Sequence, residues 1–156
     1  MSTYGHASDA WIMTREIVRS GFETYDYVGT EVVPYRSGCR LDVVGVKSRD
    51  NIIKVMEVKS CRNDFVTDKK WKNYLQFANI FYFIAPHGAI LPDELPAGIG
   101  LIEFGDLELS RPHWYVAKIG TRLHEIGDKQ HIGVLEALLY SVNRDKRIKQ
   151  KGDQAR

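Results

Sequence analysis

The segment 40–59 constrains the fold of this chain more than any other part of its sequence. Val and Ile dominate both arms of the segment, and Ser-Arg-Asp-Asn separates them, which predicts a strand, a tight turn and a second strand. If residues 49–50 form the turn, counting outward places Asp42 directly opposite Glu57. The sequence therefore predicts a β-hairpin with two acidic side chains at its open end.

Two cations share a face of this hairpin with the two acids. Because side chains alternate between the faces of a strand, Arg40, Asp42, Glu57 and Lys59 all project to the same side. Opposed Cβ atoms lie roughly 5 Å apart, and like charges at that spacing destabilise the pairing unless a cation lies between them. A divalent metal with oxygen ligands satisfies that condition. Diagonal ion pairs, Asp42 with Lys59 and Arg40 with Glu57, satisfy it as well.

The register of the hairpin is open at this stage. The turn lacks the Asn-Gly or Asp-Gly pair that specifies a two-residue hairpin turn. A bulge or a longer turn that shifts the pairing by one would move one carboxylate to the other face. Both faces are mostly apolar, which is typical of a hairpin near the middle of a sheet that is covered on both sides.

Length and composition favour one domain over residues 1–156, since 44% hydrophobic residues suffice for a single buried core. The net charge is only +2, but Lys and Arg gather between residues 54 and 72 and again from about residue 144, where we expect a basic, flexible tail. A basic patch on a nearly neutral domain suits a phosphate backbone. The cysteines form no zinc or CxxC motif, and no signal peptide or membrane-spanning run is visible, so we expect a cytoplasmic protein with no membrane contact.

The rest of the chain alternates helical and strand patterns, which predicts a mixed α/β sheet with helices on its faces. The first helix is expected over about residues 10–20, with Trp11, Ile12, Met13, Ile17 and Val18 on its buried side. The other expected elements are a strand within 22–33, a helix from 63 or 64 to about 76, a buried strand at 80–85, short strands at 99–104, 107–109 and 114–118, and a helix at about 129–149.

This order, with the acids and the lysine on its hairpin, resembles the PD-(D/E)XK nuclease superfamily, whose core is α-β-β-β-α-β. Over about residues 8–120 the chain more closely resembles the MmcB-like DNA repair proteins. That resemblance is carried by Arg40-Leu-Asp42, Met56-Glu-Val-Lys-Ser60, Asp64-Phe65, Asp68, Lys70-Trp71, Tyr74 and Phe81-Tyr-Phe-Ile-Ala-Pro86. It implies a restriction-endonuclease-like α/β fold, with a mixed central sheet flanked by helices and followed by a C-terminal helix.

The same resemblance implies a metal-dependent DNA nuclease that hydrolyses phosphodiester bonds in repair or processing, with Mg²⁺ or Mn²⁺ as cofactor. Asp42 and Glu57 take the positions of the acidic metal ligands, and the backbone carbonyl of Val58 supplies a further one. Lys59 takes the position of the catalytic lysine, as a base or as a group that orients the attacking water. Glu16, on the first helix, is a further candidate ligand. DNA is the expected partner, and a homodimer is expected because two strands need two active sites.

Residues around the hairpin are expected to support this chemistry. Asp64 and Asp68 are candidates to hydrogen-bond the residues of the site, although Asp64 can also cap the second helix and Asp68 can pair with Lys72. The alternative function is a non-catalytic DNA-binding module on the same fold. The cations expected to contact the DNA backbone are Arg40, Arg62, Lys69, Lys70 and Lys72.

Overall fold

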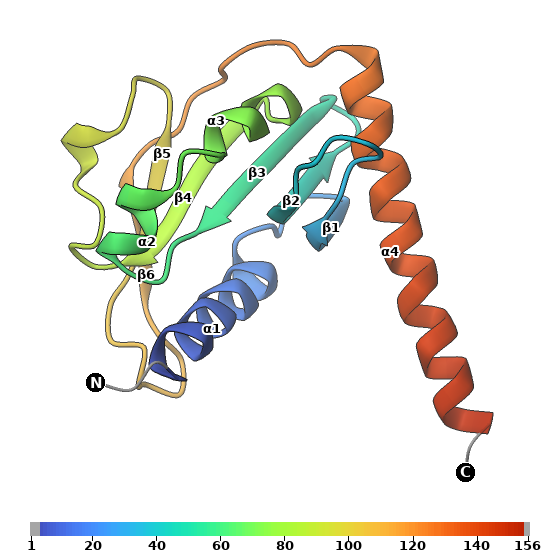
Figure 1. Cartoon of the computed structure of the whole chain (residues 1–156), viewed down its shortest axis with the longest axis horizontal. Helices are drawn as coiled ribbons and strands as arrows, with labels where there is room; N and C mark the ends of the chain where they lie inside the picture. The colour runs from blue at the N-terminus through green and yellow to red at the C-terminus, as the bar shows by residue number, and fades with distance from the viewer. Residues whose placement is uncertain (1–3, 155–156) are drawn as a thin grey trace.

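The structure is a computed structural model that describes residues 4–154, with side chains described for residues 8–141. Figure 1 shows the arrangement of its helices and strands. Their order is α1 (Tyr4–Ser20), β1 (Tyr27–Val32), β2 (Leu41–Lys47), β3 (Ile52–Val58), α2 (Arg62–Thr67), α3 (Trp71–Tyr74), η1 (Leu75–Phe77), β4 (Ile80–Pro86), η2 (Pro92–Glu94), β5 (Gly100–Phe104), β6 (Trp114–Lys118) and α4 (Asp128–Gln154).

Within the described residues, the strands form a six-stranded sheet in the order β1-β2-β3-β4-β5-β6. Neighbouring strands are antiparallel from β1 to β3, parallel from β3 to β5, and antiparallel again between β5 and β6. The hairpin of β2 and β3 therefore lies inside the sheet, as its two apolar faces indicated. The predicted fold class is confirmed: a mixed sheet, flanking helices and a C-terminal helix.

The register of the hairpin is the one that the simple count predicts. Val43 pairs with Met56, so the next positions, Asp42 and Glu57, come opposite each other at the open end. The turn itself is longer than expected and spans residues 48–51. Compared with the expected turn at residues 49–50, the observed turn includes one more residue from each strand. The pairing of the strands is therefore not shifted, and both acids stay on one face.

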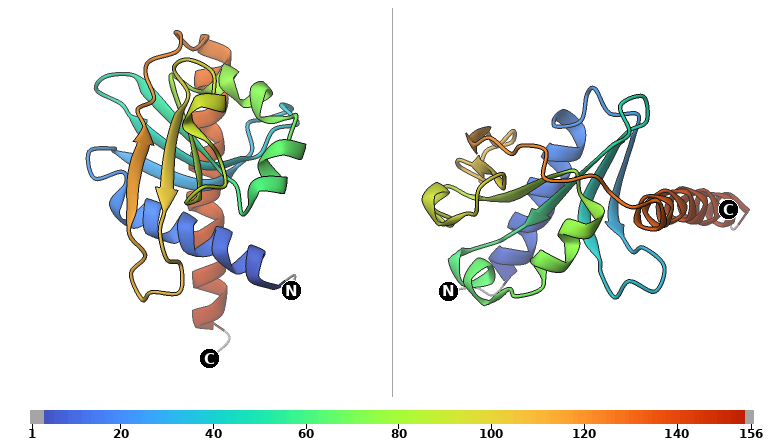
Figure 2. Two further views of the ribbon diagram at one scale, coloured as in Figure 1. Left: turned by 90° about the vertical axis from the view of Figure 1, so that its left-hand side faces the viewer. Right: turned by 90° about the horizontal axis from the view of Figure 1, so that it is seen from above.

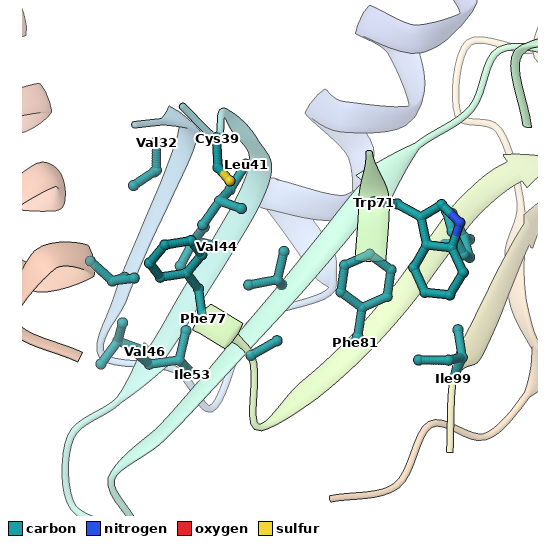
Figure 3. Packing of buried hydrophobic residues seen from close by; sticks show 14 of the residues in the cluster. Val32, Cys39, Leu41, Val44, Val46, Ile53, Trp71, Phe77, Phe81 and Ile99 are labelled. Carbon is teal, nitrogen blue, oxygen red and sulfur yellow. The ribbon is translucent and has the colours of Figure 1, made fainter. Parts of the chain in front are cut away.

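Helices lie on both faces of the sheet (Figure 2), and each face has its own apolar core. On one face α1 contributes Met13 and Ile17, which pack with Phe22, Val43, Met56, Tyr82, Ile84 and Phe104. The other face is covered by α3, η1 and the first part of α4, and Figure 3 shows its packing. Its buried residues include Val32, Leu41, Val44, Ile53, Trp71, Phe77, Phe81, Phe83, Leu101, Val134 and Leu138.

The first helix differs from the expectation in its start and in its orientation. It begins at Tyr4 rather than near residue 10, and only Met13 and Ile17 of the expected stripe are fully buried. The side chain of Trp11 is 61% exposed and that of Val18 is also exposed, so their predicted burial is wrong. On a helix, residues two positions apart point about 200° apart, and Met13 and Trp11 therefore cannot face the same core.

Two further elements differ from their predicted bounds. The helix expected from residue 63 or 64 to 76 is broken into α2 and α3, with Asp68 extended at the end of α2 (φ −74°, ψ 116°). Residues 107–109, expected as a strand, form none. Helix α4 continues through the segment from residue 144 that we expected as a tail, and it ends at Gln154. The flexibility of that segment and the single-domain organisation stay predictions.

Candidate active site

The strands of the hairpin separate where the two acids lie. The backbone N–H of Val58 donates to Oδ2 of Asp42 at 2.9 Å, and the next N–H, that of Lys59, donates to the carbonyl of Ile84 in β4 at 2.8 Å. The carboxylate of Asp42 therefore takes the place of a backbone partner for β3. Beyond this point the backbone after β3 stays hydrogen-bonded to β4 and no longer pairs with β2. The space beside the open end of β2 is therefore left for side chains.

Two acidic side chains contact the same lysine at this point. The Nζ atom of Lys59 lies 3.0 Å from Oε1 of Glu57 and 2.5 Å from Oδ2 of Asp68. Glu57 and Lys59 are buried, with 6% and 4% of their surface exposed, and Asp42 is half-buried beside them. The predicted pair of Asp68 with Lys72 is not formed, because Asp68 instead pairs with the lysine of the hairpin.

The break between α2 and α3 brings Asp68 to this cluster. Phe65 on α2 and Trp71 on α3 both make edge contacts with Phe83, at centroid distances of 5.3 and 5.2 Å. Phe83 in β4 is paired with Glu57 in β3. The segment between Phe65 and Trp71, which contains Asp68, is therefore held next to the charged cluster. Within this segment, Oδ1 of Asp68 accepts the N–H of Lys70 at 2.7 Å, the local side-chain bond by which aspartate favours turns over helix interiors.

The pKa values of the two acids of the hairpin are shifted by their surroundings. Burial and the neighbouring Asp42 raise the pKa of Glu57 to about 8, and burial also raises the pKa of Asp42. Burial alone would lower the pKa of Lys59, but its contacts with Asp68 and Glu57 outweigh burial and raise that pKa. The reverse holds for Asp68: burial opposes ionisation, but the bond to Lys59 prevails and lowers its pKa. The lysine is therefore held as an ammonium ion, and its contact with Glu57 only partly offsets the effects of burial and of Asp42 on that acid.

The donor atoms at this site fit a divalent cation. Oε2 of Glu57 is buried and finds no hydrogen-bond partner in the part of the chain that the structure describes, whereas Oε1 of the same carboxylate accepts a hydrogen bond from Lys59. Among the described residues, no group of three or more His, Cys, Asp and Glu side chains is placed to hold one metal ion. Two carboxylates, completed by backbone, water or phosphate oxygens, are a set that suits Mg²⁺, which keeps several waters and binds through one or two protein carboxylates.

The cluster opens into a cavity of about 800 Å³. Helix α1 forms one wall, and the ends of β1, β2 and β3 form the other. Figure 1 shows α1 and α2 on either side of the end of β3. The charged residues that line the cavity are Arg15, Glu31, Arg40, Asp42, Glu57, Lys59 and Asp64, and its other lining residues include Trp11, Thr14, Val18, Thr30 and Val58.

The structure brings most, but not all, of the predicted acids to this cavity. Asp64 lines it, and its Oδ2 accepts the N–H of Ser60 at 2.9 Å, which holds the chain that follows Lys59. Glu16 is not among the lining residues. It is buried elsewhere on α1, where its carboxylate lies 2.6 Å from Arg19, and this hydrogen bond lowers its pKa. Among the predicted ligands, Glu16 is therefore the one that the structure does not place at the site.

The predicted DNA-binding cations lie in two places. Arg40 lines the cavity and is mostly exposed, 3.9 Å from Glu31. Arg62, Lys69 and Lys72 instead line a second depression over α2 and α3. There, Arg62 forms an ion pair with Glu94. Lys70 is exposed and lines neither depression.

Sequence reasoning missed the cavity wall formed by α1. Trp11, Thr14, Arg15 and Val18 follow one another at helical spacing and all line the cavity. Arg15 lies over the Trp11 ring, 4.7 Å from its centroid. The stripe was visible in the sequence, but the parallel stripe of Met13 and Ile17 has the same period, and periodicity alone does not say which of two faces meets the core.

Together, fold and site define a mixed α/β domain with an acid pair and a lysine at the open end of a central hairpin. The chain belongs to a family of DNA repair proteins: the model of the MmcB-like family, described as "DNA repair protein MmcB-like", matches residues 2–112. No curated protein matches the chain at a significant level. A solved structure, the SPO1766 protein of unknown function from Silicibacter pomeroyi, is similar in fold, with a TM-score of 0.67 and 21% identity over 94% of this chain and 90% of that one.

The family supports DNA repair as the process and DNA as the partner. None of the helices within residues 4–154 has the length and apolar character needed to cross a membrane. The cytoplasmic location and the homodimer stay predictions.

Proposed function

We propose that this chain is a metal-dependent DNA nuclease that hydrolyses phosphodiester bonds during repair, with Mg²⁺ or Mn²⁺ as its cofactor. One observation carries the proposal: Asp42, Glu57 and Lys59 line one cavity at the end of the hairpin, and no described group forms a hydrogen bond with the buried Oε2 of Glu57. Two like charges at that place are unfavourable without a cation. Their position in a chain of a DNA repair family favours a role in chemistry on DNA.

In this proposal Asp42 and Glu57 hold the metal, and the backbone carbonyl of Val58 is a third candidate ligand. When bound, such an ion polarises a phosphate oxygen and lowers the pKa of a bound water. The protein's own contribution is to fix the two carboxylates. The Val58 N–H holds Asp42, and Lys59 holds one oxygen of Glu57, which leaves the other oxygen free for the ion.

Lys59 is proposed to act as a cation rather than as a base. Its raised pKa keeps it protonated at neutral pH, because Asp68 and Glu57 both stabilise the ammonium form. An ammonium beside the metal ligands stabilises negative charge that develops on the phosphate or orients the attacking water. Asp68 is a positioning residue in this scheme, since it contacts Lys59 and lies outside the residues that line the cavity.

The surrounding cations supply a path for the DNA backbone. Arg40 lies at the cavity itself, whereas Lys69 and Lys72 are exposed on the neighbouring depression and suit contacts with phosphates further along the strand. Lys70 is exposed beside them. Arg62 is paired with Glu94, so a phosphate must displace that carboxylate to bind it.

The test is cleavage of end-labelled single-stranded, duplex and flap oligonucleotides with Mg²⁺, with Mn²⁺ and with EDTA. Asp42→Asn and Glu57→Gln are expected to lower cleavage at least 100-fold, as removal of a single stabilising group at a reacting centre does. Glu31→Gln is the matched control, because it removes a carboxylate from the same cavity but from outside the proposed ligand set. No cleavage by the wild type with either metal, together with intact DNA binding, would replace the proposal by the non-catalytic binding module.

A further inference from the structure

We propose that Trp11 and Arg15 form a binding site for one unpaired nucleotide, and that the chain therefore acts on single-stranded DNA or on a single-stranded stretch within a duplex. This inference rests on the proposed function, whose substrate class it specifies. Its central observation is the position of an exposed indole ring in the wall of the cavity that also contains Asp42, Glu57 and Lys59.

Trp11 contributes little to the described core of the protein. Helix α1 already fills the core with Met13 and Ile17, which are fully buried, whereas 61% of Trp11 is exposed. Val18 on the same wall of the cavity is also exposed, and exposed apolar groups that gather beside a polar cavity are typical of binding surfaces. The ring lies on the helix face that also carries Thr14 and Val18, which line the same cavity.

The charges around the ring suit a nucleotide. Arg15 lies over the indole, 4.7 Å from its centroid, and 48% of its side chain is exposed. Its other contact is with Glu16, at 3.4 Å. Arg40 lies on the opposite wall of the cavity, where Glu31 is the nearby acid. Arg15 stacks over one face of the indole, and Arg40 lies across the cavity, so a base that stacks on the opposite face or takes the place of Arg15 would have two guanidinium groups near its phosphates.

The geometry favours an unpaired base over a duplex. In a double helix both faces of each base are covered by its neighbours, so a single projecting indole finds no base face to stack on. In a single strand the bases are free, and stacking on an aromatic side chain is independent of sequence. A ring in the wall of the catalytic cavity would thus hold a nucleotide close to the phosphate that is cleaved.

The experiment measures binding without cleavage, so that it does not depend on activity. Fluorescence anisotropy in EDTA compares a labelled single strand with the same strand annealed to its complement. Trp11→Ala is expected to weaken binding of the single strand about 5- to 100-fold and to change duplex binding less than about twofold. Trp11→Phe keeps a ring and is expected to retain most of the single-strand affinity.

The matched control is Tyr35→Ala. Tyr35 is also an exposed aromatic residue with an arginine over its ring, Arg36 at 5.1 Å, but it lines a different groove, between the end of β1 and α4. Its removal should leave single-strand binding unchanged. Urea unfolding of both variants checks that the fold is intact, and both midpoints should equal that of the wild type.

Three results would overturn the inference: unchanged single-strand binding in Trp11→Ala, an equal loss for single strand and duplex, or an equal loss in Tyr35→Ala. A failed proposal of nuclease activity is a separate outcome, since it appears as absent cleavage in the wild type and leaves these binding ratios as they are. If both ideas hold, Trp11→Ala also lowers cleavage of single strands at subsaturating DNA, and saturating DNA restores it.

Discussion

Lys59 Nζ lies 2.5 Å from Oδ2 of Asp68, a contact that joins the end of β3 to the break between α2 and α3. Both side chains are largely removed from solvent, and each shifts the pKa of the other toward the charged form. The pair therefore fixes the ammonium group beside Glu57 whether or not DNA is present. The first two predictions depend on this contact.

Replacing Asp68 by Asn should impair catalysis through Lys59 without touching the metal ligands. The expected loss in kcat is 10- to 100-fold, the usual effect of residues that orient a reacting group, with KM nearly unchanged. Because Asp68 helps to raise the pKa of Lys59, the basic limb of the pH–rate profile should also move to lower pH. A purely structural role for Asp68 would lower stability but leave that limb in place.

Replacing Lys59 by Met should abolish cleavage and destabilise the fold. The ionised Asp68 would then lie largely buried without its cation, and removal of one partner of such a pair costs about 3–5 kcal/mol. Urea unfolding measures the change. The double variant Lys59→Met/Asp68→Asn removes the stranded carboxylate, so part of the lost stability should return; no recovery would contradict this account of the cluster.

The stability of the metal-free protein should fall as pH rises across the neutral range. Glu57 has a pKa of about 8 in the folded chain, against an ordinary value of 4.5, so between these two pH values the folded state holds a proton that the unfolded state has released. Stabilisation from this group is complete below pH 4.5 and is lost as pH rises through about 8.

Since one pKa unit corresponds to about 1.4 kcal/mol, the effect should reach the order of a few kcal/mol in unfolding free energies measured from pH 5 to pH 8.5 in EDTA. Glu57→Gln should flatten this dependence and be the more stable protein at pH 8. A pH dependence that is the same in both proteins would show that Glu57 is not its source.

Binding of Mg²⁺ should release a proton and strengthen as pH rises. A carboxylate must be ionised to hold the ion, and in the metal-free protein Glu57 is largely protonated at pH 7. Calorimetric titration at pH 7 in two buffers of different ionisation enthalpy measures the released protons. Glu57→Gln should bind the ion weakly and release none, whereas Glu31→Gln should behave as the wild type.

Added Mg²⁺ should also reverse the loss of stability at pH 8, because it binds the folded state only. The thermal unfolding midpoint of the wild type should rise with Mg²⁺ concentration. That of Asp42→Asn should not respond.

Much of the fold follows from local patterns in the sequence. The two apolar arms of segment 40–59 predicted the central hairpin, and the symmetric count from its turn predicted the opposition of Asp42 and Glu57. That count survived a turn two residues longer, since one residue was added on each side. Apolar runs likewise located β4, β5 and β6 to within one residue.

The break between α2 and α3 could not be read in the same way. The stripe of Trp71, Tyr74 and Leu75 has a helical period, and nothing local shows that Asp68 is recruited by a lysine nine residues earlier. Helix α2 ends at Asp68 because two sets of contacts outweigh the small free-energy gain from one continuous helix. These are the ion pair of Asp68 with Lys59 and the packing of two aromatic rings on Phe83.

The sequence by itself determined the central hairpin and the residue types at its open end, because these depend on the apolar pattern of two adjacent strands. It predicted the register only by assuming a symmetric turn, and the structure confirmed that register. Only the tertiary structure decided that Asp68 completes the cluster, that Glu16 stays outside it, and that Trp11 faces the cavity rather than the core. Those outcomes depend on how helices are rotated and placed against the sheet. That choice is made by the summed packing of side chains far apart in the chain, which no local pattern contains.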